Sequence, residues 1–471
     1  MDAWSSRLGF LLAAIGSAVG IGNIWRFSSV VGQNGGGAYL IPFFLAVFAF
    51  ALPLMILELA VGRHLKENVV SAFRRAGPGF HIFGWFICVV VLLILSYYLV
   101  ITGWTLFYLI SSLLGHSVSF SGFSSSYQPV AYFVVSALVT GAVVSLGVRE
   151  GIEKISKILI PFSLLILVAL ALYATTLSGF GQGVDFFLTP DFGVLGDPLI
   201  WSAAFGQAFF SLSVGFGVLI TYGSYLDRET SIPRSSLIIA LADLSIAMLA
   251  GLIIFPIVFT QGLTPTMGAE LAFSTLPAAF ERMPSGHLLA TSFFMVLFFA
   301  AITSSIAMLE VNVAAVTGAT GVSRKKGSLL LTIALLLMGL PSALSYSSLS
   351  LRVAGARILD LMDETVGTLG LPLTGLITAV VFTWFLKKEA FSSEIASRRW
   401  LSLVYPATRY VIPAVLVVVT ASTLLISTEV GVLHFVPDTE WVTNLARGVV
   451  LAVMASLLLL GRAILKSLEN L

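Results

Sequence analysis

Three polar side chains stand inside apolar stretches of the chain, where water cannot solvate them. Asp243 lies in the apolar run centred near residue 248, and Asn23 and Ser211 lie beside glycine-rich interruptions of two other runs. A carboxylate inside a membrane span faces a cavity or a partner by default; the alternative for Asp243 is a salt bridge or a protonated, hydrogen-bonded acid. Carboxylate, amide and hydroxyl oxygens suit a hard cation, and sodium is the abundant one.

Weaker candidates for the same chemistry lie in two further apolar runs. Thr303 and Ser304 offer hydroxyls in the run centred near residue 300. Hydroxyls in membrane helices most often bond back to carbonyls of their own helix, so this pair is a weak signal alone. Tyr98 lies halfway along its run, which is an unusual depth for a tyrosine of the membrane interface.

Two glycine-rich stretches are the elements that must position these residues. Val-Gly-x-Gly occurs at 19–22 and again at 214–217, each time inside an apolar run of membrane-spanning length. Each glycine weakens a helix by about 1 kcal/mol and permits unusual backbone angles. For either pair alone, close packing of helices through small residues is the alternative. Because the motif is duplicated beside polar residues, we expect two broken helices whose freed backbone groups line a polar cavity.

The composition places the whole chain in a membrane. Of the 471 residues, 58% are hydrophobic and only 10% are charged. Apolar runs of about 20 residues, enough to cross a ~30 Å hydrocarbon core, predict transmembrane helices. We count twelve such runs, centred near residues 20, 50, 98, 138, 165, 212, 248, 300, 335, 376, 417 and 454.

The order of these runs predicts an internal symmetry. Two sets of five spans each start with a broken helix, and the first set begins on one side of the membrane while the second begins on the other. The predicted fold class is an all-α polytopic membrane protein of twelve transmembrane helices, with a 5+5 inverted repeat and a site at the midplane. The predicted parts are a first repeat at 1–175, a second repeat at 195–390, and peripheral helices 11 and 12 at 405–471.

The charge distribution orients the chain. With the N-terminus in the cytoplasm, 20 of the 25 Lys and Arg residues lie on that side, which predicts that both termini are cytoplasmic. These basic runs are interpreted as orientation signals and contacts with the lipid bilayer, so nucleic acid is not an expected partner.

No His-Glu-x-x-His, Gly-x-Ser-x-Gly or Walker motif occurs, and we do not expect an enzyme. The single cysteine, Cys88, excludes an internal disulfide.

At these residues the chain closely resembles the neurotransmitter:sodium symporter family, in the prokaryotic amino-acid transporter branch that includes the bacterial leucine transporter. The resemblance is close over spans one to ten and looser over the last two. It is carried by the stretches 16–27, 34–37, 58–63, 97–104, 207–225 and 298–307. It implies the leucine-transporter type of inverted repeat and a sodium-coupled symporter that works by alternating access.

The resemblance implies two sodium sites. In the first, Ser211 stands where the leucine transporter has threonine and Asp243 where it has asparagine, and both substitutions keep an oxygen in place. The first site would use the carbonyl of Ala18 with Asn23, Ser211, Asp243 and the substrate carboxylate. The second site would use carbonyls of Gly16, Val19 and Ala300 with hydroxyls of Thr303 and Ser304.

The resemblance also implies where the substrate binds. Its carboxylate would meet Tyr98 and the freed amides near Gly20 and Gly22. Its amino group would meet carbonyls of Ala18, Phe210 and Ser213, and its side chain would lie among Ile94, Phe210, Ser213, Phe216, Ser304 and Met308. Amine transporters of this family carry an aspartate at the position of Gly20. Glycine leaves room for the substrate's own carboxylate, and the apolar pocket favours a neutral hydrophobic or aromatic amino acid.

Gates are implied on both sides of the site. Arg26 with Asp363 would form the outer gate, closing over Tyr98 and Phe210. On the inner side the family's ion pair falls on Met1 and Gly318, so both members are missing, and Trp4, Arg7 and packing must replace them. The spacing from Gly151 to Pro161 matches the fifth-span motif that relatives use for helix unwinding and inward solvent access.

Chloride is not expected to take part. Animal members of the family hold chloride with a tyrosine and a serine, whose positions fall on Phe43 and Ala247, and neither side chain can bind an anion. Asp243 can supply the negative charge instead. The absence of an Asn-x-Ser/Thr sequon suits a prokaryotic plasma membrane, the inner membrane of the cell.

Three alternatives to a sodium-coupled symporter stay open. Val-Gly-x-Gly resembles part of a potassium-channel filter, although such a filter usually needs four loops around one axis. A proton-coupled carrier could use Asp243 in place of sodium. A non-transporting amino-acid sensor could keep the same binding site.

Overall fold

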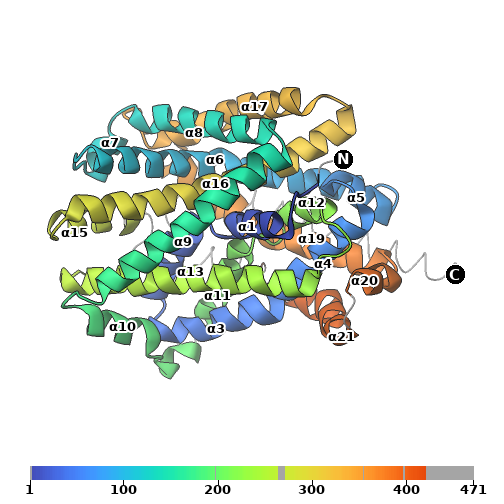
Figure 1. Cartoon of the computed structure of the whole chain (residues 1–471), viewed down its shortest axis with the longest axis horizontal. Helices are drawn as coiled ribbons and strands as arrows, with labels where there is room; N and C mark the ends of the chain where they lie inside the picture. The colour runs from blue at the N-terminus through green and yellow to red at the C-terminus, as the bar shows by residue number, and fades with distance from the viewer. Residues whose placement is uncertain are drawn as a thin grey trace.

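The computed structural model describes residues 3–196, 198–263, 271–353, 355–395, 398–418 and 420. Within these ranges the chain is a bundle of helices, most of which run roughly parallel to one long axis (Figure 1). The one sheet of the described residues is a hairpin of β1 (Arg352–Val353) and β2 (Ala356–Arg357), in which Arg352 pairs with Arg357 and Val353 with Ala356. The all-helical membrane fold predicted from the composition is therefore confirmed.

The first half of the chain holds the first five spans. Its α-helices are α1 (Arg7–Ala18), α2 (Phe27–Gln33), α3 (Leu40–Leu45), α4 (Leu52–Leu65), α5 (Val69–Ala76), α6 (His81–Leu113), α7 (Phe120–Ser124), α8 (Gln128–Ser145), α9 (Lys154–Ala174) and α10 (Phe180–Leu188). Its π-helical turns are η1 (Gly22–Arg26), η3 (Ala46–Ala51) and η4 (Val148–Glu153), and its 3₁₀ turns are η2 (Gly37–Tyr39) and η5 (Phe192–Gly196).

The second half starts with the second broken helix. Its α-helices are α11 (Pro198–Ser211), α12 (Val218–Ser224), α13 (Ile232–Thr260), α15 (Leu276–Glu281), α16 (Gly286–Thr320), α17 (Arg324–Ser345), α18 (Ile358–Met362), α19 (Thr368–Phe385), α20 (Lys388–Glu394) and α21 (Arg398–Pro406). Its π-helical turns are η6 (Leu271–Thr275), η7 (Asp363–Gly367) and η8 (Ala407–Val411).

The predicted spans have counterparts through the eleventh. In the described part of the chain, nine helical segments are long and apolar enough to cross a membrane, or ten with the bent pair 7–18 and 22–33 counted as one span. The short helices α11 and α12 make up the broken sixth span. The predicted twelfth span, near residue 454, lies outside the described residues. The boundaries of the two repeats stay predictions.

The first break lies where the glycines predict it. α1 begins at the N-cap Ser6, whose hydroxyl accepts a hydrogen bond from the amide of Gly9, and ends at Val19, whose backbone is extended. The chain resumes as the π-helical turn η1, and the two halves of the span are bent by 55°. The residues of this break are buried by the surrounding helices, so the backbone groups that the break frees are not exposed to lipid.

A hydrogen bond with a neighbouring helix stabilises the backbone of the second break. Ser213, Gly215 and Gly217 all have left-handed backbone angles, with φ of 52°, 84° and 70°. The amide of Gly215 donates a 2.8 Å hydrogen bond to Oε1 of Glu58, which is fully buried on α4. A left-handed serine costs energy and persists only where its surroundings impose it, as is common at functional sites. Glu58 is one of the contacts that impose this backbone.

Two long helices complete the surroundings of the breaks. α6 has 33 residues and α16 has 35, and they pack against each other along the bundle (Figure 1). α16 also packs against α1. α4 approaches α12 so closely that a Cβ at Gly62 would lie 2.0 Å from the carbonyl oxygen of Ile220. The two breaks are therefore enclosed by α4, α6 and α16.

Candidate functional site

The polar cluster predicted at the breaks is present. Asn23 comes from η1, Ser211 from the end of α11 and Asp243 from the middle of α13, and all three are buried. Nδ2 of Asn23 lies 2.5 Å from Oδ1 of Asp243 and 2.7 Å from Oγ of Ser211. Oγ of Ser211 donates to the other carboxylate oxygen, Oδ2 of Asp243, at 2.6 Å. Asn23 thus forms one closed triangle with two residues that lie 188 and 220 positions further along the chain.

This triangle fits a hard cation with one small change. Oδ1 of Asn23 accepts a 3.1 Å hydrogen bond from the amide of Gly20, inside the first break. A half-turn of the Asn23 amide would exchange its oxygen and nitrogen and bring three side-chain oxygens together, at the loss of the hydrogen bond from the amide of Gly20. Oxygen ligands of this kind are those that hard cations prefer. Asp243 has hydrogen-bond partners but no ion pair among the described residues, so no basic side chain there is paired with its carboxyl group.

A second oxygen-rich group lies where α16 meets α1. Oγ of Ser304 lies 3.3 Å from the carbonyl oxygens of Gly16 and Ser17, and 3.4 Å from that of Val19. A hydroxyl has one proton, so it can satisfy only one of these three carbonyls at a time. Thr303 instead bonds back to Phe299 and Ala300 of its own helix, at 2.9 and 3.1 Å. The predicted ligands of the second site are therefore neighbours in space.

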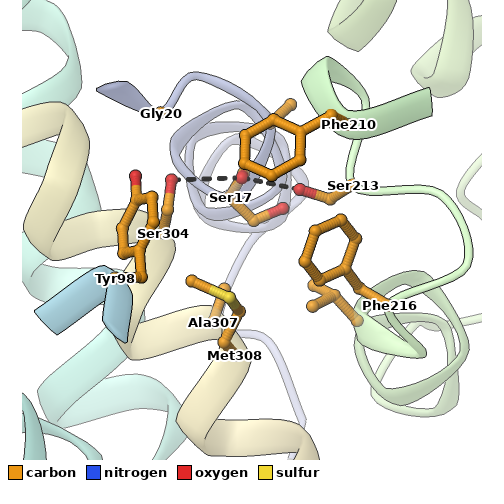
Figure 2. A pocket seen from close by; sticks show the side chains of 11 residues that line it. Ser17, Gly20, Tyr98, Phe210, Ser213, Phe216, Ser304, Ala307 and Met308 are labelled. Atoms are coloured by element: carbon orange, nitrogen blue, oxygen red, sulfur yellow. Dashed lines mark hydrogen bonds between the residues drawn. The ribbon is translucent and has the colours of Figure 1, made fainter. Parts of the chain in front are cut away.

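A cavity separates the two breaks. It is lined by Ser17, Ala18, Gly20, Tyr98, Phe210, Ser213, Phe216, Val218, Ser304, Ala307 and Met308. Figure 2 shows Tyr98 and Ser304 on one side, and Phe210, Ser213 and Phe216 on the other. The carbonyl oxygen of Ser17 accepts from Ser213 at 2.7 Å and from Ser304 at 3.3 Å, which links the two sides (Figure 2). None of these eleven lining residues carries a charge.

Two glycines leave room at one end of the cavity. A Cβ at Gly20 would lie 2.9 Å from the hydroxyl oxygen of Tyr98 and 3.1 Å from Oγ of Ser304. The same hydroxyl accepts a 3.2 Å hydrogen bond from the amide of Ile21, which the break frees from its helix. A Cβ at Gly22 would lie 2.8 Å from the ring of Phe210. This end therefore presents a hydroxyl and backbone amides rather than side-chain bulk.

The cavity differs in part from the predicted substrate pocket. Eight of the ten predicted residues line it, whereas Ile94 is buried without lining it and Gly22 faces the ring of Phe210. Ser17, Val218 and Ala307 line the cavity and were not predicted. Each adjoins a predicted feature, since Ser17 precedes Ala18, Val218 follows the second break and Ala307 lies next to Met308.

Arg26 and Asp363, the residues predicted as an outer gate, do not pair with each other. The guanidinium carbon of Arg26 lies over the ring of Phe210, 5.0 Å from its centroid. Asp363 accepts a 2.9 Å hydrogen bond from the hydroxyl of Tyr97. No ion pair joins Arg26 to Asp363 in this conformation, although both are described residues. The two groups are therefore available to meet only after a movement.

At the face where the chain begins, contacts other than the family's ion pair join the helices. Nε1 of Trp4 donates to the carbonyl oxygen of Tyr222 on α12 at 3.1 Å, and the two rings are 5.0 Å apart. Glu310 of α16 is buried and pairs with Arg324, the first residue of α17. It also accepts from the hydroxyl of Tyr225 at 2.7 Å. Trp4 therefore contacts α12 at this face, and its role as a gate stays a prediction; the Glu310–Arg324 pair was not predicted.

The segment between Gly151 and Pro161 also contacts the start of the chain. It begins in the π-helical turn η4, and Glu153 at the end of this turn accepts from the amide of Ser5 at 2.8 Å. Nζ of Lys157 lies 2.6 Å from Oε1 of the same carboxylate. Arg7, the other residue expected to replace the missing ion pair, lines a separate cavity at this face with Trp4.

The two positions tied to chloride are apolar in the structure. Phe43 is fully buried, and its ring lies 5.1 Å from that of Phe27 and 5.9 Å from that of Tyr39. Ala247 is fully buried on α13, one helical turn after Asp243. Neither position offers a hydrogen-bond donor to an anion.

Two broken helices that meet across a buried cavity, with an oxygen-rich cluster beside each break, define a secondary transporter of the inverted-repeat class. Comparison with known proteins supports this class. The profile of the sodium:neurotransmitter symporter family matches residues 1–128 and 115–468. The chain therefore belongs to this family, and it is a sodium-dependent symporter rather than an enzyme.

Individual relatives come from distant organisms. YhdH of Bacillus subtilis, an uncharacterized sodium-dependent transporter, is 35% identical over 437 residues, which cover 88% of this chain and 96% of YhdH. The sodium- and chloride-dependent GABA transporter 2 of Bos taurus is 28% identical over 364 residues, 66% of this chain and 60% of that protein. The crystal structure of MhsT in complex with L-phenylalanine matches with a TM-score of 0.83 and 36% identity, covering 90% of this chain and all of MhsT.

Proposed function

We propose that this symporter imports a neutral hydrophobic or aromatic L-amino acid together with sodium, by alternating access. The observation that carries the proposal is the cavity between the two breaks, which has apolar and hydroxyl-bearing walls and no charged lining residue. A substrate with a net charge would lose its hydration there without a counter-charge from the walls. A zwitterion with an apolar side chain suits both parts of the cavity. MhsT, one relative of known structure, was crystallised in complex with L-phenylalanine.

The end of the cavity at Gly20 suits the substrate's carboxylate. The hydroxyl of Tyr98 can donate to an anion, and it already holds the first break in place by accepting from the amide of Ile21. A carboxylate that binds there lies beside the Asn23–Ser211–Asp243 triangle, and a sodium ion in the triangle would neutralise it. The opposite end, with Phe216 and Met308, takes the apolar side chain.

Two sodium ions are proposed, one at each oxygen-rich cluster. The first binds Asn23, Ser211, Asp243 and the carbonyl of Ala18, and it touches the substrate carboxylate. The second binds the carbonyls of Gly16, Val19 and Ala300 with Thr303 and Ser304. Because the first ion and the substrate contact each other, each raises the affinity of the other by the same factor. This reciprocity is the physical basis of symport.

Transport is proposed to be independent of chloride. When it is ionised, Asp243 places a negative charge in the first cluster, and the side chains of Phe43 and Ala247 offer no donor to an anion. A chloride ion near an ionised Asp243 would be repelled strongly in this dry interior. In this scheme Asp243 is ionised while sodium is bound and can take up a proton on the empty return.

Alternating access needs the two faces to open in turn. Arg26 and Asp363 are proposed to approach each other over Phe210 when substrate is bound, which closes the outer side. On the inner side, Trp4 is proposed to act as the gate through its hydrogen bond to the carbonyl oxygen of Tyr222. We place the inner side in the cytoplasm of a plasma membrane, with both termini there, because the basic residues gather on that side.

Reciprocal binding tests this proposal. Purified protein in detergent is titrated with labelled phenylalanine, leucine and, as a charged control, lysine, at several sodium concentrations. The affinity for phenylalanine or leucine should rise with sodium, and sodium should bind more tightly in the presence of the amino acid. A proton-coupled carrier that uses Asp243 would bind the amino acid equally well in sodium-free buffer, with a dependence on pH instead. That result would replace the sodium mechanism.

A further inference from the structure

Arg409 lies in an aromatic cage far from the transport cavity. It belongs to the π-helical turn η8, and its guanidinium carbon lies 5.4 Å from the ring centroid of Trp384, 5.5 Å from that of Tyr410 and 5.8 Å from that of Tyr405. Nη1 donates to the hydroxyl of Tyr405 at 2.9 Å. Such a cage holds the guanidinium in one place by cation–π attraction. It does not neutralise the charge.

A second cation converges on the same cage. Nζ of Lys388, the first residue of α20, lies 5.4 Å from the ring centroid of Tyr405. Neither Lys388 nor Arg409 has an ion pair among the described residues. The carboxylate of Glu394 on α20 is already engaged by Arg63, at 2.5 Å. Two like charges near one ring repel each other, and an anion that contacts both would relieve this.

The hydrogen bonding of the guanidinium is also incomplete. Nε of Arg409 is buried and has no acceptor in the described part of the chain. The bond to Tyr405 uses one of five N–H groups. A guanidinium fork matches the oxygens of a phosphate or a carboxylate, with two parallel hydrogen bonds. The guanidinium of Arg409 therefore has an N–H group without an acceptor among the described residues, and Lys388 lies near the same ring.

The cage lies at the membrane boundary. Nε1 of Trp384 donates to the carbonyl oxygen of Arg409 at 3.1 Å, so Arg409 is level with the last turn of α19, which ends at Phe385. This is the end of the tenth span on the proposed cytoplasmic face. Trp384 is 45% exposed and Tyr410 58% exposed. Exposed Trp and Tyr at this depth belong among lipid headgroups.

We propose that Arg409 and Lys388 bind the phosphate of an anionic phospholipid in the leaflet on this face, with the exposed faces of Trp384 and Tyr410 against the lipid. An anionic lipid is favoured over a zwitterionic one, because the positive headgroup of the latter would approach two cations. A phospholipid is favoured over free phosphate, because two aromatic side chains of the cage, Trp384 and Tyr410, are exposed and would otherwise offer apolar surface to the lipid without a partner. The proposal uses the assigned transport function only to name the leaflet.

Native mass spectrometry of the full-length protein in detergent tests the site. The protein is titrated with phosphatidylglycerol, phosphatidylcholine or inorganic phosphate, and bound adducts are counted. Phosphatidylglycerol should bind most tightly. The double variant Arg409→Gln/Lys388→Gln should bind it roughly tenfold or more weakly, as expected for the loss of two cations at a lipid surface. The matched control Arg74→Gln/Lys325→Gln, which removes two exposed cations elsewhere on this face, should stay within about twofold.

Two further variants keep the test decisive. Arg409→Lys retains the charge but loses the fork, and its affinity should fall between those of the unmodified protein and the double variant. Lys388→Gln alone changes an exposed side chain, so it reports on the site even if replacement of Arg409 prevents folding. Equal affinity for phosphatidylglycerol and phosphatidylcholine would overturn the proposal. So would displacement of the lipid by millimolar inorganic phosphate, or an equal loss in the control variant.

Discussion

Replacement of Gly20 by aspartate separates an amino-acid transporter from an amine transporter at a single position. A Cβ at Gly20 would lie 2.9 Å from the hydroxyl oxygen of Tyr98 and 3.1 Å from Oγ of Ser304. Any side chain there must displace one of these groups. A carboxylate does more, because it enters the end of the cavity assigned to the substrate's own carboxylate.

The loss of amino-acid affinity in Gly20→Asp has two contributions, a steric one and an electrostatic one. Gly20→Ala carries the steric part alone, and Gly20→Asp carries the steric part and the charge. Two carboxylates about 4 Å apart at an effective dielectric constant of about 20 repel by about 4 kcal/mol. This corresponds to a loss of affinity on the order of a thousandfold for an amino acid. The amine formed by removing the substrate's carboxylate escapes the repulsion, so it should lose far less.

Equilibrium binding at saturating sodium measures both parts. Labelled phenylalanine and phenethylamine are titrated against the unmodified protein, Gly20→Ala and Gly20→Asp, and the ratio of the two affinities is compared. Gly20→Ala should leave the ratio nearly constant, and Gly20→Asp should shift it toward the amine by two to three orders of magnitude, on the scale set by the repulsion above. An unchanged ratio in Gly20→Asp would remove the assignment of Gly20 to the carboxylate end.

Three further outcomes are expected. Asp243→Asn should raise the sodium concentration for half-maximal uptake by roughly 10- to 100-fold, as expected for the loss of a charge-assisted contact, or make uptake chloride-dependent. Replacing chloride by gluconate should not change uptake by the unmodified protein. Ser304→Ala removes one neutral oxygen and should raise the sodium concentration for half-maximal uptake by about fivefold; an unchanged value would exclude Ser304 as a ligand. In a Cys88→Ala background, Arg324→Ala should speed the labelling of Ser224→Cys at the inner face, because removing one partner of a buried pair costs about 3–5 kcal/mol in the closed state; equal labelling rates would show that the pair does not hold this face closed.

Much of the site could be predicted from local sequence. The two Val-Gly-x-Gly stretches gave the positions of both breaks, because glycine is costly in a helix wherever it occurs. Asn23, Ser211 and Asp243 could be grouped before their contacts were known, since polar groups inside apolar spans must find one another or a ligand. Their triangle, with distances of 2.5 to 2.7 Å, follows that reasoning.

The rest depends on geometry that the sequence does not record. Ser17, Val218 and Ala307 line the cavity because of how α1, α12 and α16 are rotated, and rotation is set by packing between helices. Ile94 was expected in the cavity but is buried outside its lining for the same reason.

The contacts of the gate residues could not be predicted from the sequence for a different reason. Arg26 and Asp363 were predicted as a pair from the family resemblance, but pairing in a transporter depends on which conformation is populated. In the present conformation Arg26 lies over Phe210 instead. The contact between Glu310 and Arg324 joins two helices across a turn, and a buried glutamate alone does not reveal which of several nearby cations will reach it.

Uptake into proteoliposomes tests the central claim most directly. The purified protein is reconstituted, and accumulation of labelled phenylalanine is followed under an inward sodium gradient, under an inward proton gradient without sodium, and with no gradient. The account predicts concentrative uptake only with the sodium gradient, and no difference when chloride is replaced by gluconate. Full uptake driven by the proton gradient in sodium-free buffer would contradict it.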